Sequence, residues 1–284
     1  MRLSYYPGCS LKTSSRFYEA SILKVFSHYG IELEEVDDWS CCGASAAHTI
    51  DEHLAHLLSA RNLALAEARD YPLFAPCSAC YIRSRMTNEK VRDDADFQTE
   101  VNEALAPLVC EGTLEVKNII EVLEEYVGVE AMAKNNRHGL SGLKAVPYYG
   151  CVLTRTMRIT PYDDKENPES MDVLIEALGM KVVAWPYKME CCGAGKTLTD
   201  KDVTRRLSEK IMDMAITLGA DVIVTPCPLC QMNLDLLPLI GRTAASLPVL
   251  FLPEVFELAL FGSLTGTGSH IIPADGVLKK IGEA

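Results

Sequence analysis

The stretch Glu190-Cys191-Cys192-Gly193 decides the fold of this chain. A single cysteine, Cys151, lies upstream across a spacer of 39 residues, and Cys227-Pro228-Leu229-Cys230 lies downstream across a spacer of 34. The first half repeats this pattern, with spacers of 31 and 34 residues, at Cys9, Cys41-Cys42-Gly43 and Cys77-Ser78-Ala79-Cys80. Ten of the eleven cysteines therefore fall into two sets of five, and the chain is a duplication.

Composition and charge narrow the class of protein before any motif is used. Of the 284 residues, 48% are hydrophobic and 23% are charged, as in ordinary soluble globular proteins. The formal charge is 27 − 39 = −12, so nucleic acid and anionic membrane surfaces are poor partners. The chain starts without a signal-peptide pattern, and the apolar residues 247–262 are interrupted by two prolines and two glutamates. We therefore expect no transmembrane segment, a buried strand plus helix at 247–262, and a cytoplasmic protein.

The use of cysteine points to metal or cluster binding. A reducing compartment disfavours structural disulfides, and eleven is an odd number in a chain large enough to bury its own core. Cys110 belongs to neither set, and we expect it to be an inert core residue.

Strand, cysteine group and helix alternate three times in each half, which is typical of an α/β fold with a mostly parallel sheet. The periodicity predicts strands, each followed by a cysteine group, at 2–6, 31–36, 71–75, 180–185 and 221–225. It predicts helices at 14–29, 51–69, 119–126 and 201–218, with further helix running to about residue 109. Residues 128–143 have the composition of a linker, so the predicted domains are 1–127 and 144–284. Ligands of parallel sheets gather at the carboxyl ends of strands, so three loops could bring five thiolates to one point.

Five thiolates are too many for an ordinary zinc site or cubane cluster, each of which takes four ligands. Adjacent cysteines also diverge unless the backbone turns sharply, and Gly43 and Gly193 would permit such a turn. The pattern therefore predicts an unusual cluster, in which a thiolate bridges two irons or one iron is kept for exchange. Pro76 and Pro226 would lead into helices whose N-terminal amides favour thiolates.

The twin pattern resembles the cysteine-rich CCG domain, and the whole chain resembles the B subunits of heterodisulfide reductases. The resemblance extends from Tyr5 to about Leu260. Its motifs are Tyr-Pro-Gly-Cys (6–9), Ser-Cys-Cys-Gly (40–43), Glu-Cys-Cys-Gly (190–193) and Thr-Pro-Cys-Pro-Leu-Cys-Gln-Met-Asn (225–233). It implies two pseudo-symmetric Rossmann-like CCG domains with cluster ligands at the carboxyl ends of the strands.

The same resemblance implies a noncubane [4Fe-4S] cluster in each half. The first would be bound by Cys9, Cys41, Cys42, Cys77 and Cys80, and the second by Cys151, Cys191, Cys192, Cys227 and Cys230. A disulfide, in methanogens that of coenzyme M with coenzyme B, would be cleaved or reversibly formed between the clusters. Each cluster would supply one electron and transiently hold one sulfur. Electrons would arrive through a C subunit with cubane [4Fe-4S] clusters, which is itself fed by a flavin-containing A subunit.

Two other functions fit the cysteine pattern. CCG domains also occur in electron-relay subunits of complexes that oxidise lactate, glycolate or succinate, and related proteins occur in sulfur-metabolising organisms. Many of those subunits carry a ferredoxin-like segment or an incomplete cysteine set, whereas both sets here are complete. A zinc-stabilised scaffold is the third possibility.

A few residues outside the cysteine sets are further candidates. His48 is a candidate proton or hydrogen-bond donor near the first set, with a solvated histidine as the alternative. Lys196, and less so Lys188, could attract an anionic substrate to the second set. His53 and His56 share a helix face at i, i+3 but have no acidic third ligand, so we expect both to be surface residues.

Overall fold

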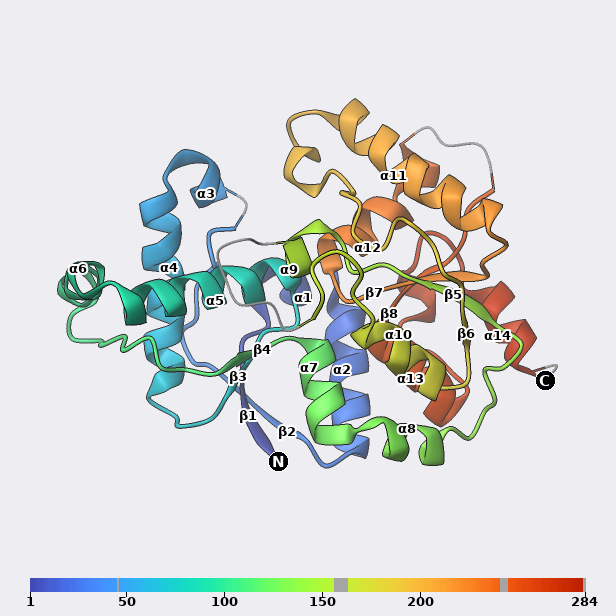
Figure 1. Ribbon diagram of the computed structural model, residues 1–284, viewed down its shortest axis with the longest axis horizontal. Helices are drawn as coiled ribbons and strands as arrows, with labels where there is room; N and C mark the ends of the chain where they lie inside the picture. The colour runs from blue at the N-terminus through green and yellow to red at the C-terminus, as the bar shows by residue number, and fades with distance from the viewer. Residues whose placement is uncertain (45, 156–162, 241–244, 283–284) are drawn as a thin grey trace.

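The computed structural model describes residues 1–44, 46–155, 163–240 and 245–282 (Figure 1). Each half of the chain contributes one parallel sheet of four strands. The first sheet has the order β2-β1-β3-β4, and the second has the matching order β6-β5-β7-β8. The strands are β1 Arg2–Tyr5, β2 Glu32–Glu35, β3 Leu73–Phe74, β4 Val116–Lys117, β5 Lys144–Pro147, β6 Lys181–Val182, β7 Val222–Thr225 and β8 Val249–Phe251. The α/β fold with two pseudo-symmetric halves is confirmed.

Helices follow the strands in the same succession in both halves. Those of the first half are α1 Gly8–Lys12, α2 Arg16–His28, α3 Ala46–Ile50, α4 Glu52–Glu67, α5 Ser78–Asp93, α6 Ala95–Leu105 and α7 Ile119–Val122, the last extended by a π-helical turn at Leu123–Val127. Then come α8 Val129–Asn135, α9 Cys151–Arg155, α10 Ser170–Ala177, α11 Lys201–Thr217, α12 Pro228–Asp235, α13 Leu252–Phe261 and α14 Asp275–Gly282. Short 3-10 turns lie at Ala194–Lys196, Leu237–Leu239 and Thr267–Ser269.

Two segments show more detail than the sequence predicts. The segment 128–143 connects the two halves and contains α8, which packs against α10. The helical segment after Cys80 is formed by two helices, because Asp94 is extended (φ −129°, ψ 97°) and ends α5. The Asp94 carboxylate then accepts a hydrogen bond from Phe97 N at 3.0 Å, which caps α6.

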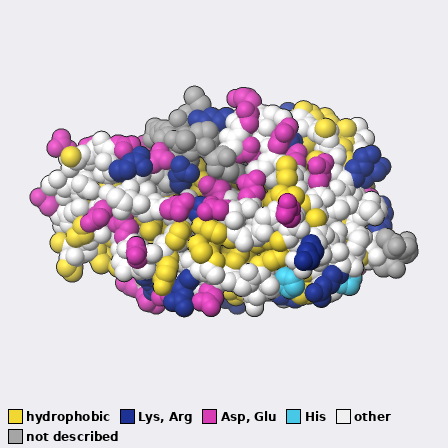
Figure 2. Space-filling view, turned by 60° about the horizontal axis from the view of Figure 1, so that its bottom comes forward, with side chains coloured by type: hydrophobic (Ala, Val, Ile, Leu, Met, Phe, Trp, Pro, Cys, Tyr) yellow, Lys and Arg dark blue, Asp and Glu magenta, His cyan; other side chains and the backbone are white. Residues whose placement is uncertain are grey.

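The apolar segment 247–262 forms β8 and α13, as predicted. Among the described residues, the structure contains no helix with the length and apolarity needed to span a membrane. On the face in Figure 2, the described Lys and Arg side chains are scattered among Asp and Glu, without forming a basic patch.

The two halves share one interface, in which a helix of each half packs on a helix of the other. Helix α2 of the first half lies against α13 of the second (Figure 1). The buried Glu257 of α13 accepts a hydrogen bond from Ser21 Oγ at 2.7 Å, and its Oε1 lies 3.1 Å from Lys24 Nζ. One buried hydrophobic cluster includes side chains from both sheets, so the halves are held together by a common core.

The sheet topology determines where a site can form. In both sheets the strand order reverses beside the first strand, between β1 and β3 and between β5 and β7. Loops leaving the carboxyl ends of such strands diverge and open a crevice. The cysteine groups follow the carboxyl ends of β1, β2 and β3 in the first sheet and of β5, β6 and β7 in the second, so all of them lie at this edge.

Candidate iron–sulfur sites

Each half gathers its five cysteines from three loops at one edge of its sheet. In the second half, Cys151 begins α9 after β5, the pair Cys191-Cys192 follows β6, and Cys227 is the N-cap of α12. The first half repeats this arrangement with α1, the loop after β2 and α5. Cys42 Sγ lies 3.4 Å from Cys80 Sγ, and the equivalent distance between Cys192 and Cys230 is 3.6 Å. All eleven cysteines are free thiols, and Cys110 is buried in the core as expected.

A glycine before the first cysteine of each set makes room for the last sulfur. Gly150 has φ +76°, and a Cβ atom there would lie 2.9 Å from Cys230 Sγ. Gly8 has φ +68°, and its Cβ would lie 2.7 Å from Cys80 Sγ. Only glycine suits both the left-handed backbone and this close approach. The sharp turn predicted after each adjacent pair is also present, since Gly43 and Gly193 have φ of +75° and +80°.

Matching hydrogen bonds hold the two Cys-Cys loops. The buried Tyr6 hydroxyl donates to Ser40 O at 2.8 Å, and Tyr148 donates in the same way to Glu190 O at 2.7 Å. Both accepting carbonyls directly precede a Cys-Cys pair. The repeated tyrosine is visible in the sequence, but this role of its hydroxyl is not, because the accepting carbonyl lies on another loop.

The exposed thiol of each Cys-Cys pair, Cys41 or Cys191, has a lowered pKa. A hydrogen bond from Cys151, aided by the Gly193 amide at 3.3 Å, lowers the pKa of Cys191 to about 6 against the opposing effect of burial. Hydrogen bonds from Cys42 and then Cys9 lower the pKa of Cys41 well below its ordinary value. The buried Cys80 and Cys230 have raised pKa values, because the hydrogen bonds and charges of neighbouring thiols and desolvation favour the neutral form. Each set can therefore present a thiolate toward solvent.

One tyrosine joins the two sites. The buried Tyr18 hydroxyl of α2 lies 2.9 Å from Pro226 O and 3.3 Å from Pro76 O, the carbonyls that precede Cys227 and Cys77. Its ring stacks on Phe251 of β8 at a centroid distance of 3.9 Å and an angle of 7°. The entry loops of the two Cys-x-x-Cys motifs are therefore side by side, on either side of this hydroxyl.

A cavity of about 70 Å³ lies at the second site. It is lined by all five cysteines of the second set and also by Ser78 and Ala79 of the first half. Among the described residues, no group of three or more His, Cys, Asp or Glu side chains is arranged to hold a single metal ion. Five thiols around a small cavity are instead a donor set that fits an iron–sulfur cluster.

The other candidate residues are separate from the cysteine cavity or already paired. The prediction that Lys188 attracts an anionic substrate is wrong, because Lys188 is buried. Its Nζ lies 2.6 Å from Asp172 Oδ1 and 2.8 Å from Pro168 O. Lys196 is exposed in the 3-10 turn that follows Gly193, beside the second set. His48 is exposed on α3, and its backbone amide donates to Gly43 O.

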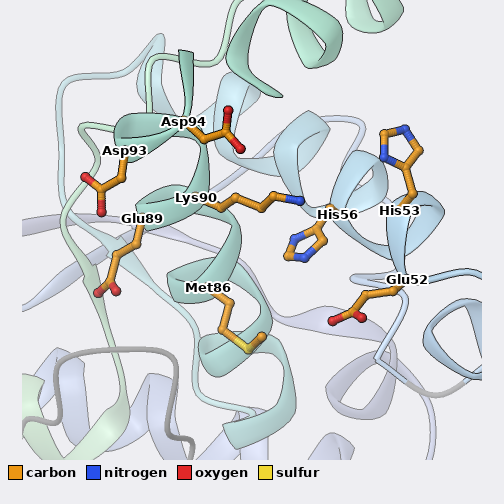
Figure 3. A pocket seen from close by; sticks show the side chains of 8 residues that line it. All are labelled: Glu52, His53, His56, Met86, Glu89, Lys90, Asp93 and Asp94. Carbon is orange, nitrogen blue, oxygen red and sulfur yellow. The ribbon is translucent and has the colours of Figure 1, made fainter. Parts of the chain in front are cut away.

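The histidines of α4 line a different pocket, shown in Figure 3. The surface prediction is wrong for His56, which is buried with Nδ1 2.8 Å from Thr87 Oγ1. His53 is more exposed and lies 3.3 Å from Glu100. The pocket is lined from α4, α5 and Asp94, and no cysteine contributes to it.

A duplicated α/β fold with five thiols at the same edge of each sheet defines an iron–sulfur redox protein, and the comparisons support this class. The family model described as "Cysteine-rich domain" (CCG) matches residues 3–83 and 145–235. The chain belongs to this CCG cysteine-rich family.

Related proteins align with nearly the full length of this chain. The 8-methylmenaquinol:fumarate reductase membrane anchor subunit of Wolinella succinogenes is 33% identical over 90% of this chain and 91% of its own length. A protein of Archaeoglobus profundus, named as similar to the B subunit of heterodisulfide reductase, is 29% identical over 99% of this chain and 98% of its own. The crystal structure of a hypothetical protein from Helicobacter pylori matches with a TM-score of 0.78 and 17% identity, which supports the fold. That match covers 96% of this chain, which spans about half (52%) of the Helicobacter chain.

Proposed function

We propose that this chain is the catalytic subunit of a heterodisulfide reductase-type complex, which reduces or reversibly forms a disulfide between two noncubane [4Fe-4S] clusters. One observation carries the proposal. Both five-cysteine sets are complete, and the loops that lead into their Cys-x-x-Cys motifs lie on either side of the Tyr18 hydroxyl. We assign Cys9, Cys41, Cys42, Cys77 and Cys80 as ligands of the first cluster and Cys151, Cys191, Cys192, Cys227 and Cys230 as ligands of the second.

The residues of the chain would contribute position, access and charge. When bound, the clusters would supply the two electrons needed to cleave a disulfide. Cys41 and Cys191 are exposed, so each site is open on its Cys-Cys side to a small thiol or disulfide. Tyr18 would hold the two sites at a fixed separation, and the exposed Lys196 would attract an anionic substrate to the second. His48 remains a candidate proton donor beside the first.

Partners and location follow from the same proposal. Several relatives are named as parts of larger enzymes, so we infer a multisubunit complex that includes one partner with cubane clusters and another that contains a flavin. Eleven free thiols suit a reducing compartment, so we propose a cytoplasmic location.

A second candidate is an electron relay without a substrate of its own. It is favoured by the 33% identity to a protein named for a fumarate reductase, which exceeds the identity to the Archaeoglobus protein. A relay would use the same clusters and the same close approach at Tyr18, but it would need no open position for a thiol.

Metal analysis and electron paramagnetic resonance (EPR) of the anaerobically purified protein test these alternatives. We expect about eight irons per chain, the content of two [4Fe-4S] clusters, and a new EPR signal when a substrate thiol such as coenzyme M or coenzyme B is added to the oxidised protein. Full iron content with no response to any thiol, together with electron transfer to a fumarate reductase-type partner, would favour the relay. Zinc in place of iron would contradict both.

A further inference from the structure

Ser78 belongs to the Cys77-Ser78-Ala79-Cys80 motif of the first half, yet it lines the cavity of the second site. It is the first residue of α5 and is only 2% exposed. Among the described residues, its Oγ makes no hydrogen bond of standard geometry. A buried hydroxyl without a partner costs about 1–3 kcal/mol, so this hydroxyl is a candidate donor to a group bound in the cavity.

The contacts between the halves explain how Ser78 reaches the other site. Tyr18 binds the carbonyls of Pro76 and Pro226, which places the N-terminus of α5 beside that of α12. Helix α9, which begins at Cys151, also packs against α5. The cavity that Ser78 reaches in this arrangement is lined by the five thiols of the second set.

The second half offers no equivalent of this hydroxyl. The position that matches Ser78 in Cys227-Pro228-Leu229-Cys230 is Pro228, which has neither a hydroxyl nor a backbone N–H. The two sites share their turn glycines and the hydrogen bonds of Tyr6 and Tyr148. They differ in the length of the first spacer, and in the second site Asn233 Nδ2 donates to Cys192 Sγ at 3.6 Å. The Ser78 hydroxyl is therefore one of the differences between the two sites.

We propose that Ser78 Oγ donates a hydrogen bond to a sulfur of the second site and so raises the reduction potential of that site. This inference rests on the proposed pair of clusters. A hydrogen bond to a ligand sulfur stabilises the more negative, reduced form of an iron–sulfur cluster. Ser78 is thus a positioning residue of the first half that acts across the interface on the second site.

A redox titration of the full chain, followed by EPR, tests the proposal. The two signals are first assigned by their loss in C41S and C191S. We expect S78A to keep the iron content of the unaltered protein, to lower the midpoint potential of the second signal and to leave that of the first unchanged. S78T retains a hydroxyl, so its second signal should keep the midpoint potential of the unaltered protein. S78G serves as a second deletion variant in case S78A loses iron.

The outcomes distinguish this inference from the function on which it rests. Two clusters with unchanged potentials in S78A or S78G would overturn the role of Ser78 and leave the two-cluster proposal intact. An unaltered protein that binds no iron would overturn both. A shift of both potentials by the same amount would also contradict the inference, because it would indicate a general structural change.

Discussion

The Tyr18 hydroxyl lies 2.9 Å from the carbonyl oxygen of Pro226, a residue of the other half that is 208 positions away in the chain. Because Pro226 precedes Cys227 and the same hydroxyl is 3.3 Å from Pro76 O, one side chain bridges the entries to both cysteine sites. The duplicated motifs build each site separately. Tyr18, which comes from one copy only, fixes how the two sites face each other.

The first prediction concerns this bridge. Y18F keeps the stacking on Phe251 but leaves buried carbonyls without their donor, which should cost about 1–3 kcal/mol and lower the thermal midpoint by several degrees. We also expect a weaker magnetic interaction between the two clusters in EPR spectra of the reduced protein, because their separation is no longer fixed.

Y29F is the matched control for Y18F. The Tyr29 hydroxyl is buried but makes no hydrogen bond among the described residues, so its removal breaks none and should neither lower the midpoint nor change the spectra. Equal effects of the two substitutions would show that the bridge through Tyr18 has no special role.

The sequence predicts the repeated parts of the molecule and misses the unrepeated ones. Spacing and turn glycines are enough to place the cysteines at strand ends, because that arrangement depends on local order and on the parallel sheet. The roles of Tyr18 and Ser78 depend on contacts between the halves, and no local sequence pattern predicts such contacts. The pairing of Lys188 with Asp172 and the burial of His56 were missed for the same reason, since their partners come from other elements.

The second prediction concerns the glycine that precedes Cys151. In G150A the new Cβ would lie 2.9 Å from Cys230 Sγ, so we expect loss of the second cluster and about half of the iron. G30A is the control, because Gly30 also has a positive φ (+69°) but a Cβ there would meet nothing within 4 Å. G30A should lower the thermal midpoint through backbone strain, at a cost of about 1–2 kcal/mol, and keep its iron. Equal iron content in both variants would argue against a steric requirement at Gly150.

The third prediction tests the assignment of the cysteines. C191S should remove the second cluster, because serine is a poor ligand for the iron of such clusters, and should abolish disulfide reduction while the first cluster remains. C41S should do the same at the first site. C110S is the control, since Cys110 is buried away from both sets and its replacement should change stability without changing iron content. Iron lost equally in C110S and C191S would contradict the assignment.

The fourth prediction is a pH dependence that arises from the buried pair of His270 and Glu254 of α13. His270 Nε2 lies 2.8 Å from Glu254 Oε1, and both side chains are fully buried. Burial alone would lower the pKa of His270, but the hydrogen bond and charge of Glu254, with a contribution from Asp235, raise it above its ordinary 6.5. Burial raises the pKa of Glu254 above 4.5, although His270 opposes this.

Both shifts have the same sign in their effect on stability. A group whose pKa is raised on folding stabilises the protein below its unfolded pKa, and this contribution is lost as the pH rises through the folded value. As the pH rises above about 6.5, the thermal midpoint of the unaltered protein should therefore fall relative to that of H270Q, in which the histidine no longer titrates. H53Q is the control for the loss of a histidine that lies outside this pair. The measurement is the midpoint between about pH 5.5 and 8.5 at one scan rate, and parallel profiles for H270Q and the unaltered protein would refute the role of the buried pair.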